Sequence, residues 1–384
     1  MFKTWIKRNL QGDPVIWFVV FCLGLISILV VYSATGTLAY RKTGGNTEHY
    51  LIKHASYMAL GFVAMWIAHK IDYRYYAKLS LLALWVSLPL LIVSWKFGSS
   101  INEASRWLYV PGLGLTFQPS DLAKFALVSN LASMLAKRQS NIESIKETLV
   151  PLLLWCGSIC GAIALTNIST AILMFATCLL LMFIGRVPLK YLAMLVLVGM
   201  LFFSLALAIG QRMNTAVNRV KKFLDKSEIP FQAQQSYIAI ATGGVLGKGP
   251  GNSTQRNFLP HPYSDFIYAI IIEEYGVVGA LIVLGLFLLL LYRGMITVQN
   301  SDRAFGGLLS AGLSFLIVIQ ALINMGVAVG LGPITGLPLP LLSMGGTSLL
   351  FTGISIGIIL SVSKGEGIEF NEDGKIANAD TDER

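Results

Sequence analysis

The segment from Gly243 to Glu274, GGVLGKGPGNSTQRNFLPHPYSDFIYAIIIEE, places a single acid, Asp265, between a glycine-rich basic stretch and a long apolar run. Polar groups that gather at one end of an apolar run need a reason, because most of the chain is close to hydrocarbon in composition. A carboxylate beside flexible backbone and cations is suited to a charged substrate carried by a lipid. Asp265 is therefore our first candidate for chemistry, as a general base.

A structural role for Asp265 is the alternative. Ser264 and Asp265 stand at the start of the apolar run, where short polar side chains cap free helix amides and contribute about 1 kcal/mol. Glu273 and Glu274 lie roughly 12 to 14 Å further along if the run is helical, at about 1.5 Å per residue. Acids at that depth are costly unless they face protein or water, so we expect this helix to face a polar cavity.

A second pair of charges is Asp121 and Lys124. Their spacing of three residues puts them on one face of a helix, where they could neutralise each other as a structural ion pair. The alternative is that Lys124 lines the same cavity as Asp265 and orients either that acid or a substrate.

The stretch GGVLGKGPG is only superficially similar to a phosphate loop. A Walker motif needs a glycine five residues before its Gly-Lys pair and a serine or threonine after it, but Thr242 and Gly249 occupy these places. Tight turns are one use for the glycines. Close approach of the backbone to a phosphate or a sugar is the other.

These candidates must be positioned by membrane helices. Over 384 residues, 55% are hydrophobic and 13% charged, and the mean hydropathy is +0.67, which excludes a water-soluble fold. Stretches long enough to cross about 30 Å of hydrocarbon predict an all-α polytopic membrane protein with about ten transmembrane helices. They lie near residues 15–33, 53–69, 79–95, 121–136, 149–165, 170–185, 191–210, 266–292, 305–325 and 346–363.

Positive charge orients these helices. Most lysines and arginines fall on the side of the N-terminus, which predicts that both termini are cytoplasmic and that a large extracytoplasmic loop joins helices 7 and 8. That loop is itself basic, with Arg212, Arg219, Lys221, Lys222, Lys226, Lys248 and Arg256. Long loops cross a membrane regardless of charge, and the functional alternative is that these cations meet an anionic partner such as a pyrophosphate lipid. Residues 1–364 form one transmembrane domain, and residues 365–384 are expected to be a disordered cytoplasmic tail.

Three segments carry a resemblance that covers nearly the whole chain. They are NEASRWLYVPGLGLTFQPSDLAKFAL, GKGPGNSTQRNFLPHPYSDFIYAIIIEEYG and NMGVAVGLGPITGLPLPLLSMGGTSLL. In this order and with this span count, the chain resembles the SEDS family (shape, elongation, division and sporulation) of bacterial cell-wall polymerases. The segment GNSTQRNFLP is more similar to the division branch than to the elongation branch. The resemblance implies an inverting peptidoglycan glycosyltransferase that polymerises lipid II at the outer face of the cytoplasmic membrane, at the division septum.

The resemblance also implies roles for individual residues. The acid of the family's FLPxxxxDFIF motif falls on Asp265, which becomes the catalytic residue. The residues expected to bind substrate are Arg106, Gln118, Asp121, Lys124, Arg219, Lys248, Asn252, Ser253, Gln255 and Ser343. Two positions depart from the family pattern: Asn167 stands where an Asp is frequent, and His261 replaces a common Glu. A second carboxylate is therefore not available in the FLP loop.

One acid is enough for this reaction. A glycosidase needs two carboxylates because its leaving group is poor, whereas a lipid pyrophosphate leaves readily. Lys124, Arg219 and Lys248 are candidates for stabilising negative charge on the pyrophosphate. A divalent cation, Mg²⁺ or Mn²⁺, is a further candidate for the same role.

The partners follow from the same resemblance. They are lipid II, a class B penicillin-binding protein (FtsI-like) and other membrane proteins of the division machinery, with no nucleic acid. Two rival functions stay open: a lipid II flippase or transporter that makes no bonds, and a scaffold that only docks division proteins. An elongation polymerase is the alternative within the family.

Overall fold

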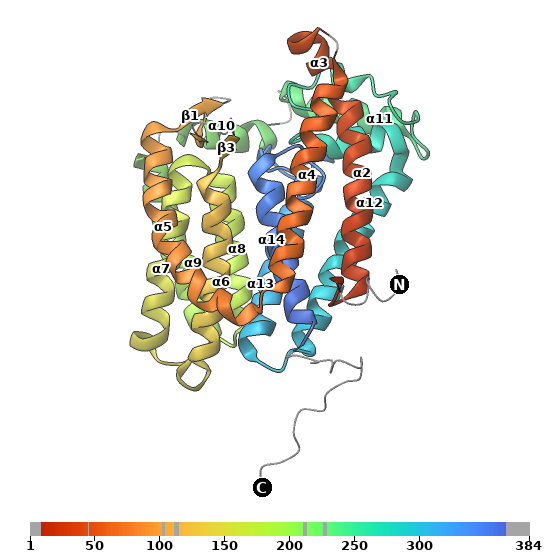
Figure 1. Cartoon of the computed structure of the whole chain (residues 1–384). Coiled ribbons are helices and arrows are strands. Elements are labelled where there is room, and N and C mark those ends of the chain that lie inside the picture. The colour runs from red at the N-terminus through yellow and green to blue at the C-terminus, as the bar shows by residue number, and fades with distance from the viewer. Residues whose placement is uncertain are drawn as a thin grey trace, which may run out of the picture.

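The computed structural model describes residues 9–44, 46–101, 104–110, 115–209, 213–225 and 229–365. Within these ranges the chain is a bundle of long helices that stand side by side, with short helices and a small sheet gathered at one end (Figure 1). The start of α2 and the end of α14 lie at the opposite end (Figure 1). The residues expected to form the tail, from 366 onward, lie outside the described ranges.

The long helices coincide with the ten ranges expected to span the membrane. They are α2 (Pro14–Ala34), α4 (Thr47–Lys70), α5 (Tyr76–Phe97), α6 (Pro119–Lys137), α7 (Val150–Thr166), α8 (Ile168–Ile184), α9 (Leu189–Ile209), α12 (Ile267–Gln299), α13 (Ala304–Ala328) and α14 (Gly346–Ser363). In the described part of the chain, seven helical stretches are long and apolar enough to cross a membrane. These contain α2, α4, α5, α7, α12, α13 and α14, while α8 and the first part of α9 are apolar but shorter.

Helix α6 is less apolar because it lies inside the bundle. Most of its residues are buried, including Asp121, Ser129, Asn130 and Ser133, and it packs against α5, α13 and α8. Polar side chains at membrane depth are tolerated when they face protein rather than lipid. The central position of α6 therefore explains its polar composition.

Helices α4 and α14 pack with their backbones in close contact. A methyl group added to Gly353 would lie 2.3 Å from the carbonyl oxygen of Gly61, and one added to Gly357 would lie 2.3 Å from that of Met65. Small residues allow this close approach. The van der Waals contacts that result stabilise the helix pair in lipid, where the hydrophobic effect does not drive helices together. The two helices consequently form one tightly packed layer beside the site.

Helix α12 is broken at Gly276, where φ is 68° and ψ is −169°. The segment 244–249 fills the break: the amides of Lys248 and Gly249 donate to the carbonyl oxygens of Glu273 and Glu274, both at 2.9 Å. In the other direction, the amides of residues 277 and 278 donate to the carbonyls of residues 244 and 245. A backbone break inside a membrane needs such partners. Gly247 thus serves close approach to protein backbone, since an added methyl would lie 2.2 Å from the carbonyl oxygen of Glu274. The sequence analysis did not consider this use.

The short elements lie between the long helices. They are α3 (Gly36–Thr43), α10 (Met213–Leu224), α11 (Phe231–Gly243), η1 (Tyr73–Tyr75), η2 (Gln139–Asn141), η3 (Ile145–Leu149) and η4 (Gln255–Asn257). An antiparallel three-stranded sheet, in the order β1-β2-β3, joins α5 to α6 and consists of β1 (Ser99–Ile101), β2 (Ala104–Val110) and β3 (Leu115–Phe117). The expectation of a purely α-helical chain was therefore wrong for this connection, because a count of long apolar runs does not detect strands this short.

Candidate functional site

Asp265 lies in the turn that leads into α12. The helix begins at Ile267 with Phe266 as its N-cap, and no side chain makes a capping hydrogen bond. The carboxylate oxygen Oδ1 of Asp265 instead accepts a hydrogen bond of 2.9 Å from the hydroxyl of Ser264. The alternative role of Asp265 as a helix cap is therefore not seen, because the helix starts two residues later and Phe266 occupies the cap position. The half-buried carboxylate is thus not committed to the helix terminus.

The segment 333–345, between α13 and α14, packs against this turn. The hydroxyl of Ser343 donates to the carbonyl oxygen of Ser264 at 2.6 Å and accepts from the amide of Leu339 at 2.8 Å. A methyl group added to Gly336 would lie 3.6 Å from Oδ2 of Asp265. Six of its thirteen residues are buried and the other seven half-buried, so the segment is covered by protein, as irregular backbone at membrane depth requires. Ser343, expected to bind substrate, therefore fixes the loop to the turn that carries the acid.

Asn324 of α13 also holds this turn. Its side-chain amide donates to the carbonyl oxygen of Asp265 at 2.8 Å and to that of Leu337 at 2.7 Å. Asn324 is buried, and its two hydrogen bonds hold the acid and the loop in a fixed relation. The sequence analysis missed this residue.

The ion pair between Asp121 and Lys124 is present. The ammonium of Lys124 lies 3.0 Å from Oδ1 of Asp121, and both side chains are largely buried. The same ammonium donates to Oε1 of Gln320 at 3.2 Å, whose amide donates to the carbonyl of Pro338 at 2.9 Å. Thr347 of α14 donates to the other oxygen of Asp121 at 3.3 Å.

Gln320 and Asn324 connect the two candidate sites. They stand four residues apart on α13 and hold the consecutive carbonyls of Pro338 and Leu337. Residues with this spacing share one face of a helix. A continuous chain of contacts therefore runs from Lys124 to Asp265 through the segment 333–345. The sequence contains one sign of this connection: the amide side chains of Gln320 and Asn324, which are spaced four residues apart in an otherwise apolar segment.

Glu273 organises the basic loop. Its carboxylate is fully buried and lies 2.6 Å from the ammonium of Lys248. It also accepts hydrogen bonds from the hydroxyl of Ser253, from the amide of Thr254 at 3.0 Å and from the amide of Gln255 at 3.2 Å. Groups of the described protein therefore satisfy the Glu273 carboxylate, where the sequence led us to expect a polar cavity.

The neighbouring acid, Glu274, is buried in the same manner. It accepts from the hydroxyl of Ser33 on α2 and from the amide of Ser253 at 3.3 Å. The guanidinium of Arg256 reaches the same serine hydroxyl at 2.9 Å. Of the loop residues expected to bind substrate, Lys248, Ser253 and Gln255 are thus held against α12, while Asn252 is exposed and donates to the carbonyl of Lys248 at 3.0 Å.

Arg219 of α10 reaches the loop of the site. Its guanidinium donates to the carbonyl oxygen of Ile334 at 3.1 Å, two residues before Gly336. Gln118 precedes α6 and donates to the hydroxyl of Ser120 at 2.8 Å. Arg106 lies on β2, and its side chain is outside the described part of the structure.

Tyr263 lies in the same turn as Asp265. Burial raises the pKa of its hydroxyl, and the negative charge of Asp265 acts in the same direction. The hydroxyl therefore stays protonated at neutral pH and lies 3.2 Å from Nδ1 of His261. The amide of Met344 donates to the carbonyl of Tyr263 at 2.9 Å, which is a further link between the loop and the turn.

Metal-ligand side chains do not gather in the described residues: no group of three or more His, Cys, Asp or Glu is placed to hold one ion. Asp265 supplies one carboxylate. Mg²⁺ at phosphate sites is commonly held by one or two carboxylates together with the phosphates of the substrate, so this arrangement fits a cation shared with a pyrophosphate but not a cage built by the protein alone.

Known proteins resemble the chain over nearly its whole length. Two relatives have the name probable peptidoglycan glycosyltransferase FtsW: the protein of Geobacter metallireducens is 33% identical, covering 94% of this chain and 97% of its own, and that of Coxiella burnetii is 32% identical, covering 93% and 98%. The stage V sporulation protein E of Bacillus subtilis is 31% identical, covering 93% and 98%.

Solved structures agree with these relatives in fold. A chain of a peptidoglycan synthase complex that coordinates polymerisation and crosslinking superimposes with a TM-score of 0.71 at 26% identity, covering 92% of this chain and 97% of its own. The rod shape determining protein RodA of Thermus thermophilus superimposes with a TM-score of 0.66 at 24% identity, covering 93% and 98%.

The family model for cell cycle proteins of the FtsW, RodA and SpoVE type matches residues 13–367. This match confirms the resemblance to the SEDS family. With its apolar helices, it makes the chain a multi-pass membrane protein. The chain belongs to the FtsW, RodA and SpoVE family of cell cycle proteins.

Proposed function

We propose that this chain is a peptidoglycan glycosyltransferase that polymerises lipid II into glycan strands. The names of its relatives support this function. The observation that carries it is the placement of Asp265, whose carboxylate sits beside a buried loop without serving as a helix cap. A polar chain of contacts links it to the ammonium of Lys124.

The reaction needs one base and cationic groups. An acceptor sugar hydroxyl attacks the anomeric carbon of a lipid-linked donor, a new glycosidic C–O bond forms, and the bond from that carbon to the pyrophosphate breaks. The bonding electron pair leaves with the pyrophosphate oxygen, and the hydroxyl proton passes to Asp265. Attack opposite the leaving group inverts the anomeric centre.

Cations complete the proposal. Arg219 donates to the segment 333–345 directly, and Lys124 reaches it through Gln320. These two residues are our candidates for binding the negative charge of the substrate. Lys248 is already paired with Glu273, so we assign it to holding the loop. A divalent cation bound by Asp265 and the pyrophosphate would add charge stabilisation.

The membrane arrangement is part of the same proposal. All ten long helices cross the cytoplasmic membrane, both termini are cytoplasmic, and residues 211–264 lie outside. Positive charge at the ends of the helices supports this orientation. It puts Asp265 at the outer face, where lipid II is polymerised.

The biological setting is septal wall synthesis. The FtsW names of several relatives support a role in division. The similarity to a chain of a synthase complex that couples polymerisation to crosslinking supports a class B penicillin-binding protein as partner, with other division proteins nearby.

Glycan formation from labelled lipid II tests the function. The purified chain, with its partner, should give a ladder of polymers on a gel. Asp265→Asn keeps the size of the side chain but removes the proton acceptor, so polymer formation should fall about 100-fold or more. Asp302→Asn is the matched control, because Asp302 is exposed in the connection between α12 and α13.

Two outcomes would overturn the proposal. Full activity in the Asp265→Asn variant would remove the acid from the chemistry. A wild-type protein that makes no polymer in detergent, where no bilayer separates substrate from product, would favour a transporter.

A further inference from the structure

Two buried polar side chains reach the loop of the site from α2 and α4, helices that carry none of the candidate substrate-binding residues. Ser27 of α2 and His54 of α4 are both fully buried. The hydroxyl of Ser27 donates to the carbonyl oxygen of Leu342 at 3.0 Å, and Nε2 of His54 lies 2.8 Å from the same hydroxyl. A polar contact therefore runs from α4 through α2 to the segment 333–345.

The chemistry of these groups fixes the direction of both hydrogen bonds. A carbonyl oxygen only accepts, so the single hydroxyl hydrogen of Ser27 is used on Leu342. Nε2 of His54 must then donate to the hydroxyl oxygen, which assigns the hydrogen of the neutral ring to Nε2 and leaves Nδ1 as an acceptor. Within the described residues, this Nδ1 is buried and has no hydrogen-bond partner.

A histidine at this position is a poor choice for stability alone. A buried nitrogen without a partner costs free energy, and an apolar side chain of similar size would avoid that cost. The buried positions Met58 and Met65 of the same helix are apolar, as packing alone would favour. The hydrogen bond that His54 donates to Ser27 is therefore the reason we assign to its polar ring.

The part of the loop that Ser27 holds has an unfavourable backbone conformation. Leu341 has a φ of 61°, in the left-handed region that residues with a Cβ rarely adopt. Such a conformation persists only where surrounding contacts fix it. Ser27 fixes the carbonyl of the next residue, Leu342, and Ser343 then donates to the turn that carries Asp265. The strained residue and the contact to the acid's turn are thus two positions apart.

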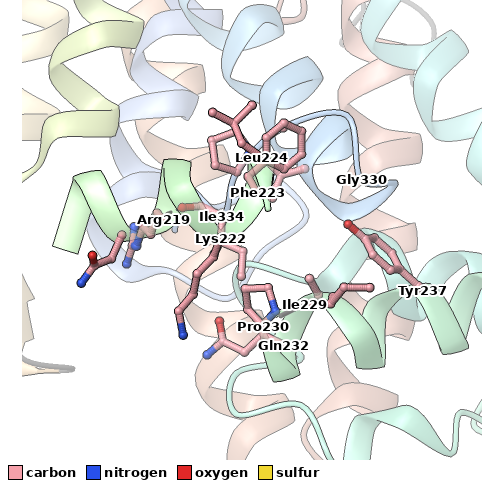
Figure 2. Close-up of a pocket in the computed structure, with 15 residues that line it drawn as sticks. Arg219, Lys222, Phe223, Leu224, Ile229, Pro230, Gln232, Tyr237, Gly330 and Ile334 are labelled. Carbon is pink, nitrogen blue, oxygen red and sulfur yellow. Dashed lines mark hydrogen bonds between the residues drawn. The ribbon is translucent and has the colours of Figure 1, made fainter. Parts of the chain in front are cut away.

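The beginning of the same connection borders open space. Gly330, Gly332, Pro333 and Ile334 line a cavity of about 770 Å³ between α10, α11 and the end of α13, and Figure 2 shows Gly330 and Ile334 beside it. Backbone that borders a cavity is restrained by fewer packed side chains. The contacts at residues 341–343 therefore matter more for fixing the loop.

From this arrangement we infer that Ser27 and His54 are positioning residues for the reaction at Asp265. The ring of His54 orients the hydroxyl of Ser27, and this hydroxyl holds the Leu342 carbonyl where Ser343 reaches the turn. The inference rests on the proposed function, because positioning is defined relative to that reaction. Both residues act through the backbone of the loop and not on the substrate.

Kinetics of glycan formation by the full-length chain with its partner test this inference. His54→Leu keeps a side chain of similar size but removes the donor to Ser27. Its kcat should fall about tenfold or more at constant KM for lipid II, because small displacements of a reacting group slow the chemistry. The thermal midpoint should stay close to that of the parent, since the change also removes an unpartnered buried nitrogen. His54→Gln carries an N–H near the position of Nε2 and should restore most of the rate.

Met65→Leu is the matched control. Met65 is buried on the same helix as His54, and the change conserves volume, so rate and stability should both stay near those of the parent. A parent-like kcat in His54→Leu would overturn the inference. A large loss of folded protein in that variant would also overturn it, because the residue would then be structural.

A double-mutant cycle shows whether His54 acts through Ser27. Ser27→Ala removes the hydrogen bond to Leu342 and should lower kcat by at least as much as His54→Leu. Because the two side chains act in series, the double variant should be no slower than Ser27→Ala alone. Losses that multiply would show that His54 acts by another route and would contradict the inference.

Hydrogen exchange supplies a readout that does not depend on activity. The amides of residues 342–344 donate to carbonyls of the loop and of the turn. They should exchange about tenfold faster in His54→Leu and Ser27→Ala than in the parent and His54→Gln, because local opening becomes easier. Parent-like exchange in both slow variants would refute the inference even if their rates fell.

These outcomes are separable from those of the polymer assay. A parent chain that makes no glycan refutes the proposed function. A parent chain that makes glycan, while His54→Leu and Ser27→Ala keep its rate, refutes the positioning role alone.

Discussion

The side chain of Asn324 holds the backbone of Asp265: its amide donates a hydrogen bond of 2.8 Å to the carbonyl oxygen of that residue. The same nitrogen donates to Leu337, so one buried amide sets the distance between the acid and the loop that faces it. Asn324 touches neither a carboxylate nor, in our proposal, the substrate. It is a positioning residue.

Asn324→Ala should lower the rate of glycan formation about 10- to 100-fold while lipid II binding persists, because small displacements of a reacting group are costly. The matched control is Ser310→Ala. Ser310 lies on α13 like Asn324 but far from Asp265, and its hydroxyl donates a buried hydrogen bond of 3.2 Å to the carbonyl oxygen of Gly294. Both variants should lose about 1 kcal/mol of stability. Dependence of the rate on lipid II concentration separates the roles: a lower kcat at constant KM supports positioning, and equal specific activities of the two folded variants would refute it.

The Asp121–Lys124 pair allows stability and activity to be separated. Lys124→Gln should destabilise the protein by about 3–5 kcal/mol, because it leaves a buried carboxylate unpaired. The double variant Asp121→Asn with Lys124→Gln should recover most of the thermal stability. We expect it to remain inactive in the polymer assay, since Lys124 binds substrate charge. Recovery of both stability and activity would reduce the pair to a structural role.

Gly276→Ala should strongly reduce the amount of folded protein. The backbone at Gly276 has a positive φ, and an added methyl would lie 2.1 Å from the carbonyl oxygen of Val245. Gly285→Ala is the control on the same helix, where nothing lies within 4 Å of the added methyl and the helix should gain up to about 1 kcal/mol. Size-exclusion profiles and thermal unfolding in detergent measure both. Normal folding of Gly276→Ala would mean that the break in α12 is not required.

The orientation is tested with single cysteines in a background that lacks the four native ones, which are free thiols. Asn252→Cys and Asp302→Cys replace exposed side chains, the first in the loop that packs on the first part of α12 and the second just after the helix ends. An impermeant maleimide added to intact cells should label the first and not the second, and lysis should make the second reactive. The reverse pattern would place Asp265 at the cytoplasmic face and exclude lipid II polymerisation outside.

Hydropathy alone located the helices, because a run of about 20 apolar residues has few alternatives in a membrane. The site was harder to predict. Asp265 stands out as a lone acid at a boundary, but its contact with Asn324 spans 59 residues of sequence and depends on how α13 packs. The glycine-rich segment was ambiguous for a related reason: a positive φ marks the need for glycine, but not whether phosphate or protein backbone approaches it.

The way in which segment 244–249 closes the break in α12 bears on how the chain is made. This segment precedes Gly276 by about 30 residues, so the ribosome synthesises the partner segment before the broken turn that needs it. Contacts so close in sequence form early, since little chain entropy opposes them. The backbone groups at the break can therefore be satisfied before α13 and α14 are synthesised.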